Sequence, residues 1–191
     1  MTEELCHDEW IQTVTGGKFY PLCPLKMHVN IEDIAHALSM ICRFVGHCRE
    51  FYSVAQHSVL VSFLGPHSRQ GLWYLLHDAP EAYIGDISRP LKRTLLIRDE
   101  NITVGAAEQR IMRVVANALN LPDNPDWDGI KNADNKLLAT EARDLMDPIH
   151  PEWDFKCPPI PLNEWSKIVP LSQKEAKKEF LKRYEELQCS E

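Results

Sequence analysis

Residues 75–92 read LLHDAPEAYIGDISRPLK, and they set charged side chains directly after an apolar helical run. The leucine spacing in front of them predicts a helix that begins near Arg69. His77 and Asp78 continue that helix, although burying a charged group is costly unless the group is paired or bound to a metal. Pro80 has no amide hydrogen to donate, so the helix must kink or restart there.

Helical spacing of apolar residues also marks the sequence on both sides of this run. A helix is expected from Ile31, with Asn30 as its N-cap and Gly46 at its end. Residues 11–20 instead favour a hairpin around a Gly16-Gly17 turn. The predicted fold class is therefore all-α, a helical bundle with a small N-terminal β-hairpin. Further helices are expected at about 53–64, 103–120, 128–146 and 172–187.

Length and charge indicate one domain over residues 1–191. The chain has 191 residues and a mass of 22.0 kDa, which suits a single core. Lys and Arg number 21 and Asp and Glu 28, and the net charge of −7 argues against polymeric nucleic acid as a partner. No apolar run approaches the roughly 20 residues of a membrane span. The acidic start also lacks a signal core, so we expect a cytoplasmic protein without a membrane partner.

The composition changes after residue 146. Six of the 13 prolines lie between 148 and 170. Residues 147–191 are therefore expected to form an extended Pro-rich segment followed by the final helix.

Four polar residues of metal-ligand type fall on apolar helical faces, namely His57, His77, Asp78 and Asp134. Two imidazoles and two carboxylates form a ligand set that accepts divalent Co²⁺, Mn²⁺, Zn²⁺ or Fe²⁺. A bound divalent metal lowers the pKa of its water enough to give hydroxide near neutral pH. Glu81 lies four residues after His77, so helical geometry places it near the site, where it can orient or deprotonate that water.

Each of these residues also has a simpler interpretation. A histidine on an apolar face is commonly a hydrogen-bonded core residue. Asp78 and Glu81 fit a helix capping box, and Asp134 can pair with Lys131 or Arg143. Taken singly, the simpler interpretation is favoured for each residue, whereas the four together indicate one inward-facing site.

At these residues the sequence resembles the HD-domain metal-dependent phosphohydrolases, whose signature H…HD…D is matched by His57, His77-Asp78 and Asp134. The resemblance covers about 30–146 and is closest to the branch with bacterial 5′-deoxynucleotidases and phage dATP triphosphohydrolases. It implies an HD-domain helical bundle with its core at about 30–146. Segments 42–44, 53–58, 77–92 and 131–134 carry the resemblance.

The resemblance implies a role for each matching position. The four signature residues would hold the metal, and Glu81 would position the attacking water with support from Asp86. Phe44 stands where relatives often have Trp, so it keeps a stacking ring but lacks the indole N–H donor. The resemblance matches Arg43, Lys92 and Lys131 to contacts with phosphate. It places Phe44 and Pro90 beside the base or sugar.

We therefore expect hydrolysis of a 2′-deoxynucleoside triphosphate at the α-phosphorus, giving deoxynucleoside and triphosphate. The choice of dATP rests on the resemblance alone. Converging Arg43, Lys92 and Lys131 suit a triphosphate better than a monophosphate. Arg89 and Arg93 extend the basic cluster around Lys92, although a solvated face explains Arg93 as well.

Three other functions compete with this one. A 5′-deoxynucleotidase would use the same metal site to release phosphate from deoxynucleoside monophosphates. A non-catalytic module would bind metal and nucleotide without turnover. A structural zinc site could be built from Cys42, His47, Cys48 and His57, although C-x₄-H-C is an unusual spacing for one.

The resemblance also implies a homo-oligomer, and host cytoplasm as the location if a phage encodes the chain. The Pro-rich segment, with Trp153, Phe155 and Trp165, is a candidate contact surface, with packing on its own domain as the simpler interpretation.

Overall fold

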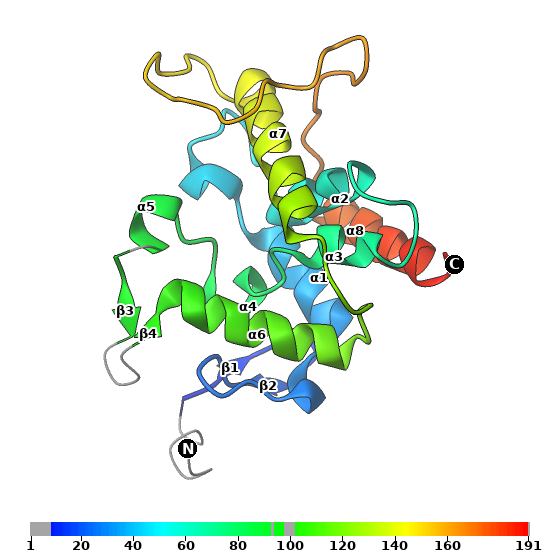
Figure 1. Cartoon of the computed structure of the whole chain (residues 1–191). Coiled ribbons are helices and arrows are strands. Elements are labelled where there is room, and N and C mark those ends of the chain that lie inside the picture. The colour runs from blue at the N-terminus through cyan, green and yellow to red at the C-terminus, as the bar shows by residue number, and fades with distance from the viewer. Residues whose placement is uncertain (1–8, 93, 98–101, 191) are drawn as a thin grey trace.

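The computed structural model describes residues 9–92, 94–97 and 102–190, and this part of the chain is mostly helical with two small antiparallel hairpins (Figure 1). The predicted helical class is thus confirmed. The helices are α1 (Ile31–Met40), α2 (Val54–Phe63), α3 (Gly71–Leu76), α4 (Glu81–Ile84), α5 (Arg89–Lys92), α6 (Val104–Ala118), α7 (Trp127–Leu145) and α8 (Gln173–Gln188). The strands are β1 (Ile11–Gln12), β2 (Lys18–Phe19), β3 (Leu96–Ile97) and β4 (Ile102–Thr103), and the short 3₁₀ turns are η2 (Lys26–His28) and η3 (Arg43–Gly46).

Side-chain caps explain where the longer helices begin. Asn30 accepts a hydrogen bond from the backbone N–H of Glu32, as predicted, and so begins α1. Ser172 and Glu175 form a reciprocal capping box at the start of α8. Equivalent caps are made by Ser53 for α2, Thr103 for α6 and Asp126 for α7.

The predicted end of the first helix at Gly46 is wrong, because α1 ends at Met40. Beyond it the chain is extended and pairs with the residues before α2, where Cys42 and Ser53 form an isolated antiparallel bridge. The backbone N–H of Arg43 donates to the carbonyl of Tyr52 at 2.9 Å. This pairing, which crosses a loop, fixes Arg43 beside the start of α2.

The second hairpin also departs from the prediction, which placed only one hairpin, at the N-terminus. Strands β3 and β4 pair with Leu96 opposite Thr103 and Ile97 opposite Ile102. Two-residue strands are too short to show the alternation that marks a strand in sequence. Arg93, named above in the basic cluster, lies outside the described residues.

Helix α2 occupies the centre of the bundle, packed against α1, α3, α7 and α8. Its side chains are almost all buried, and its apolar members join one core with residues from the surrounding helices. His57 is fully buried in the same helix. A polar ring at this position must find partners, and these partners define the site described below.

The Pro-rich segment runs extended over the upper end of α7 and then descends to α8 (Figure 1), as its composition predicts. Gln56 of α2 holds its last part in place. The Gln56 amide donates to the Val169 carbonyl at 2.8 Å and accepts from the Leu171 N–H at 2.9 Å.

Replacing Gln56 with alanine is expected to lower the free energy of unfolding by about 2 kcal/mol, because two backbone groups lose a buried partner. Urea denaturation measures the loss. The matched control, Gln173→Ala, alters an exposed residue of α8 and should stay within about 0.5 kcal/mol. Equal stability of both variants would show that Gln56 does not anchor the segment.

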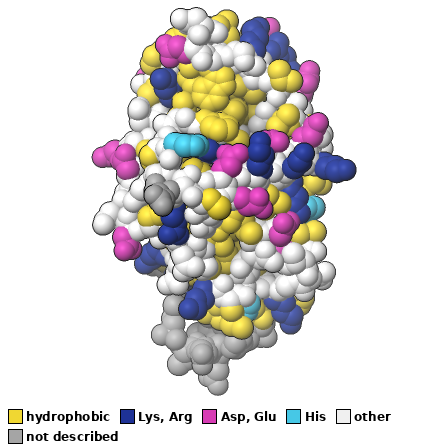
Figure 2. Space-filling view, turned by 90° about the vertical axis from the view of Figure 1, so that its right-hand side faces the viewer, with side chains coloured by type: hydrophobic (Ala, Val, Ile, Leu, Met, Phe, Trp, Pro, Cys, Tyr) yellow, Lys and Arg dark blue, Asp and Glu magenta, His cyan; other side chains and the backbone are white. Residues whose placement is uncertain are grey.

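Within the described residues, no helix combines the length and apolar character that crossing a membrane requires. On the face shown in Figure 2, acidic and basic side chains are interspersed, and apolar side chains gather in its upper part. Neither sign of charge therefore dominates that face.

Candidate metal centre

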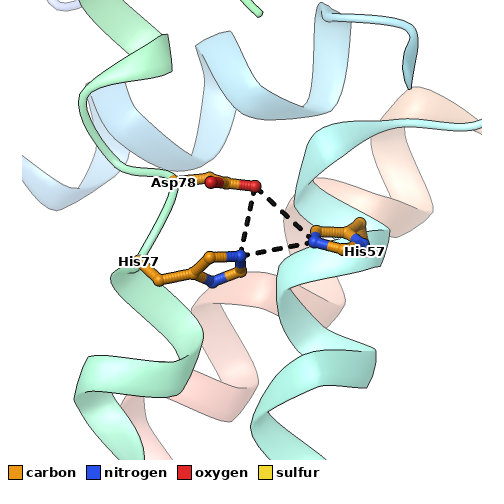
Figure 3. Close-up of side chains that lie close together, drawn as sticks. All are labelled: His57, His77 and Asp78. Carbon is orange, nitrogen blue, oxygen red and sulfur yellow. Dashed lines mark hydrogen bonds and ion pairs between the residues drawn. The ribbon is translucent and has the colours of Figure 1, made fainter. Parts of the chain in front are cut away.

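Three of the predicted ligands meet at one point in the core (Figure 3). His57 comes from α2, while His77 and Asp78 follow the end of α3. The Nε2 atoms of the two histidines are 3.3 Å apart. Asp78 Oδ2 lies 3.2 Å from Nε2 of His77 and 3.6 Å from Nε2 of His57. Among the described residues, this is the group of histidine, cysteine and acidic side chains whose ligand atoms come close enough to hold a metal ion.

In each histidine ring, Nδ1 lies within hydrogen-bonding distance of an oxygen that can only accept a hydrogen bond. Nδ1 of His57 lies 2.6 Å from a carboxylate oxygen of Glu141. Nδ1 of His77 lies 2.8 Å from the backbone carbonyl of Tyr74. Each Nδ1 therefore carries the hydrogen, and in the neutral ring the Nε2 lone pair faces the other histidine and Asp78. Facing lone pairs beside a carboxylate fit a divalent cation, and an oxygen partner on the outer nitrogen is typical of metal-binding histidines.

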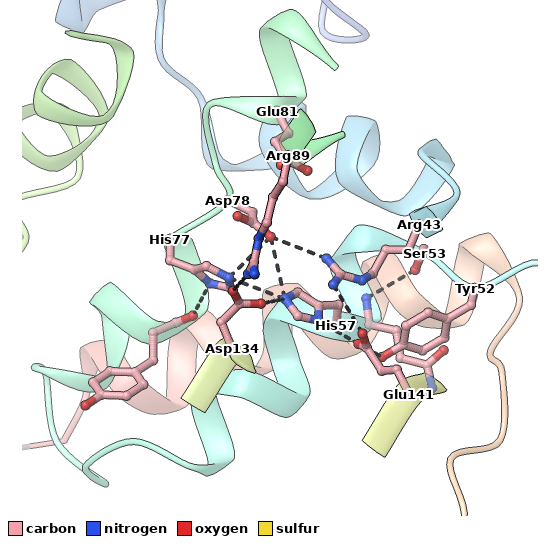
Figure 4. Close-up of polar contacts among 12 residues, drawn as sticks. Arg43, Tyr52, Ser53, His57, His77, Asp78, Glu81, Arg89, Asp134 and Glu141 are labelled. Atoms are coloured by element: carbon pink, nitrogen blue, oxygen red, sulfur yellow. Dashed lines mark hydrogen bonds and ion pairs between the residues drawn. The ribbon is translucent and has the colours of Figure 1, made fainter. Parts of the chain in front are cut away.

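Asp134 of α7, the fourth predicted ligand, borders this group (Figure 4). Its Oδ1 lies 3.4 Å from Nε2 of His57, while its Oδ2 accepts a 2.7 Å hydrogen bond from Arg89. The partner of Asp134 is thus Arg89 rather than Lys131 or Arg143. One carboxylate oxygen faces the histidines and the other is held by a guanidinium.

Glu141, which the sequence analysis did not single out, supports the site from behind. It is fully buried and accepts from the Tyr52 hydroxyl at 2.8 Å, and its second oxygen lies 3.2 Å from Arg43. Burial alone would raise its pKa, but Arg43 and His57 outweigh burial and lower the pKa. A signal was available, because Glu141 lies seven residues after Asp134 and so shares its helical face.

A cavity of about 610 Å³, here called the front cavity, opens beside the cluster. Most of the predicted site residues line it, namely Arg43, Phe44, Asp78, Glu81, Asp86, Pro90, Lys92 and Asp134. His57 and His77 lie behind Asp78 and Asp134. Lys131 is exposed on α7 and does not line the cavity. Arg89, which the sequence placed in the basic cluster around Lys92, also lines it, and so does Trp153, which was not predicted there.

Trp153 of the Pro-rich segment packs in this cavity rather than outward. Its ring meets Phe44 edge-on, with centroids 6.3 Å apart, and stacks obliquely on Phe155 at 4.8 Å. The simpler interpretation, packing on its own domain, is therefore correct for Trp153. Two aromatic rings border the cavity in place of the single Phe44 that the sequence predicted.

The loop that carries Phe44 is conformationally strained. Phe44 and Val45 have φ of 55° and 54°, in the left-handed region that β-branched and bulky side chains rarely adopt. Such strain costs on the order of 1–3 kcal/mol per residue and persists where surrounding contacts fix the backbone. Here the bridge at Cys42 and the ion pairs of Arg43 hold the loop against the cavity.

Glu81 is 4% exposed at the boundary of the front cavity. Its Oε1 lies 3.1 Å from Lys92, whereas its Oε2 is buried without a hydrogen-bond partner among the described residues. Lys92 also pairs with Glu108 at 2.8 Å. Burial and the nearby Asp78 and Asp86 raise the pKa of Glu81 well above its usual value. An unpartnered, easily protonated carboxylate oxygen is suited to hold a water molecule or to accept its proton.

The alternative zinc site does not form. The sulfur atoms of Cys42 and Cys48 are 3.8 Å apart, but His47 is exposed and His57 belongs to the other cluster. In the described part of the chain these four residues do not converge on one point.

Metal affinity should depend on pH through His77. Burial disfavours a charged ring, but Asp78 outweighs burial and raises the pKa of His77 to about 8. Below that pH a proton occupies the nitrogen that a metal needs. Between about pH 6 and 7.5, affinity for Mn²⁺ or Co²⁺ is therefore expected to rise by roughly tenfold per pH unit. Competition titration with a chromophoric chelator measures it, and a flat profile would contradict protonation of the cluster.

Sequence comparison with known proteins places this chain in a family. No known family profile matches the chain. Over 178 residues it is 39% identical to Uncharacterized protein YfdR of Escherichia coli strain K12. The aligned region covers 93% of this chain and 95% of that protein. Over 94 residues it is 38% identical to Uncharacterized protein RCAP_rcc00048 of Rhodobacter capsulatus. This second aligned region covers 45% of this chain and 48% of that protein. Given the extent of the first match, the chain belongs to the family of YfdR.

Proposed function

We propose that this chain is an HD-domain metal-dependent phosphohydrolase that hydrolyses a 2′-deoxynucleoside triphosphate, with dATP preferred, at the α-phosphorus. The observation that carries the proposal is the meeting of His57, His77 and Asp78, with Asp134 beside them, at a cavity that Arg43 lines. These are the signature residues of the HD-domain resemblance. Residues from two separate parts of the chain meet at one point, and Asp134 from a third part borders them.

The donor set fits a divalent cation, which when bound supplies a water of lowered pKa. His57, His77, Asp78 and Asp134 would hold it. Glu81 would position the attacking water and take its proton, with Asp86 at the same cavity wall. Arg43, fixed by Glu141 and 3.7 Å from Asp78, would bind phosphate oxygens.

The proposed reaction adds water oxygen to the α-phosphorus and breaks the bond from that phosphorus to the 5′ oxygen. The proton goes to the 5′ oxygen, so the products are deoxynucleoside and triphosphate. Phe44 and Pro90 would contact the base or sugar at the wall of the front cavity.

One observation favours a second candidate, the 5′-deoxynucleotidase. A triphosphate requires several unpaired cations, yet Lys131 lies outside the cavity wall and Lys92 is already paired with Glu81 and Glu108. Arg43 and Arg89 line the cavity, but they too are paired, with Glu141 and with Asp134, so the little positive charge left there suits a monophosphate better than a triphosphate.

The test is an assay of purified protein with Co²⁺, Mn²⁺ or Zn²⁺ against all deoxynucleoside and ribonucleoside triphosphates and monophosphates. Triphosphate, pyrophosphate and phosphate are separated by ion exchange. Triphosphate released from dATP supports the proposal. Phosphate from monophosphates alone identifies the nucleotidase. Binding of metal and nucleotide without any product would indicate a non-catalytic binding module.

A further inference from the structure

The metal centre has a second opening, away from the front cavity. A pocket of about 250 Å³, here called the rear pocket, touches His77, Asp78 and Glu81. Gln109, Met112 and Trp127 line its far side, and the same three residues line a groove of about 840 Å³, here called the tryptophan groove. The front cavity and the rear pocket share Asp78, Glu81 and Lys92. The rear pocket therefore borders both the candidate metal centre and the tryptophan groove.

The tryptophan groove is built around two indole rings. Trp127 is 51% exposed, whereas Trp73 is buried and donates its indole N–H to the Pro122 carbonyl at 2.7 Å. The rings meet edge-on, with centroids 5.3 Å apart and planes at 70°. Trp73 thus holds Trp127 in place and leaves it accessible to a planar ligand.

The polar side chains of the tryptophan groove suit a heterocycle. Carboxamides from Gln109, Asn117 and Asn124 line it together with Arg113. Carboxamides donate and accept hydrogen bonds as the edges of a nucleobase do. An inorganic polyphosphate tail would require more cations than this single arginine.

Trp127 also lies on the helix that carries Asp134. It begins α7, and Asp134 follows seven residues later, so both lie on one face of the helix. The front cavity has Phe44 and Trp153 on its wall, and the tryptophan groove has Trp127 and Trp73. The candidate metal centre thus borders the front cavity directly and the tryptophan groove through the rear pocket.

We propose that the tryptophan groove is a subsite for a second planar organic group on the scissile phosphate, so that the substrates include nucleotide phosphodiesters. This rests on the proposed function for the phosphate chemistry and adds a substrate class to it. Water oxygen bonds to phosphorus, the bond from phosphorus to the second ester oxygen breaks, and that oxygen takes the proton. A nucleoside monophosphate and an alcohol or phenol result.

A binding experiment tests the subsite without turnover. The protein is labelled with 5-fluorotryptophan, and its ¹⁹F spectrum is recorded with chelator present. The Trp127 signal is assigned by its loss in Trp127→Phe. The p-nitrophenyl ester of thymidine 5′-monophosphate is compared with thymidine 5′-monophosphate, which lacks the aryl group and carries more negative charge. We expect the diester to shift the Trp127 signal and to bind about tenfold more tightly than the monoester.

Two variants and one control sharpen this comparison. Trp127→Ala should weaken diester binding about tenfold and leave the monoester unchanged. Gln109→Ala, at an exposed position, should weaken the diester more mildly without affecting folding. Trp10, an exposed tryptophan outside the three hollows, serves as the control in Trp10→Ala. Equal shifts of Trp127 by both ligands, or none by the diester, would overturn the proposal.

Turnover separates this proposal from the proposed function. With Mn²⁺ or Co²⁺, release of p-nitrophenol that drops about tenfold in Trp127→Ala, with dATP hydrolysis unchanged, supports both. Hydrolysis of dATP without diester binding would contradict the proposed subsite and leave the proposed function standing. Diester binding at Trp127 with no hydrolysis of any nucleotide removes the proposed function and keeps the subsite.

Discussion

Glu81→Gln is expected to lower kcat for nucleotide hydrolysis by about a thousandfold and to leave metal content unchanged. The substitution keeps the size of the side chain and removes the carboxylate that would accept the proton of the attacking water. Among the residues that the structure describes, Oε2 of Glu81 is buried without a partner at the front cavity, and no other predicted role requires that oxygen. Steady-state kinetics and metal analysis of the same preparation measure the two quantities.

The matched control is Glu108→Gln. Glu108 also pairs with Lys92, at 2.8 Å, but it lines the rear pocket and not the front cavity. Its loss should alter kcat by less than about tenfold. If both variants lose the same activity, the effect comes from Lys92, and Glu81 is then a positioning residue. Full turnover in Glu81→Gln would remove Glu81 from the mechanism.

The helices could be predicted because their signals are local. Apolar spacing marks each helix, and a capping residue such as Asn30 or Ser172 stands next to its first turn. The end of α1 could not be predicted, because the pairing of Cys42 with Ser53 stops it from across a loop. The left-handed backbone of Phe44 and Val45 is also hidden, since neither residue type favours it.

The same distinction applies to the candidate site. Polar residues on apolar helical faces could be recognised one by one, and the structure brings His57, His77 and Asp78 together as that pattern predicts. Partners far apart in sequence could not be recognised. Arg89 reaches Asp134 over 45 positions. Lys131 is the converse case, because lying three residues before Asp134 does not bring its side chain to the wall of the front cavity.

Glu141→Gln is expected to weaken metal binding by about 10–100-fold without removing a ligand. In the native protein the carboxylate holds the outer nitrogen of His57 at 2.6 Å and pairs with Arg43 at 3.2 Å. The amide can still accept from His57, but it carries no charge and turns a donor toward Arg43. With no negative charge beside Nδ1 of His57, the basicity of Nε2 falls, and Nε2 is the atom that would bind the metal.

A purely structural role for Glu141 would give a different result. Uncoupling a buried charge pair costs about 3–5 kcal/mol of stability, so metal affinity is measured at pH 8, at a temperature where circular dichroism shows the variant folded. Burial and Arg43 lower the pKa of His57, whereas Glu141 is among the groups that outweigh them and raise it, so the pH at which protons displace the metal should also fall in Glu141→Gln. Glu32→Gln, which breaks an exposed pair with Lys177, should change neither quantity. Lower stability with unchanged affinity and unchanged pH dependence would show that Glu141 supports the core alone, and the orientation of His57 would then be set by its own helix.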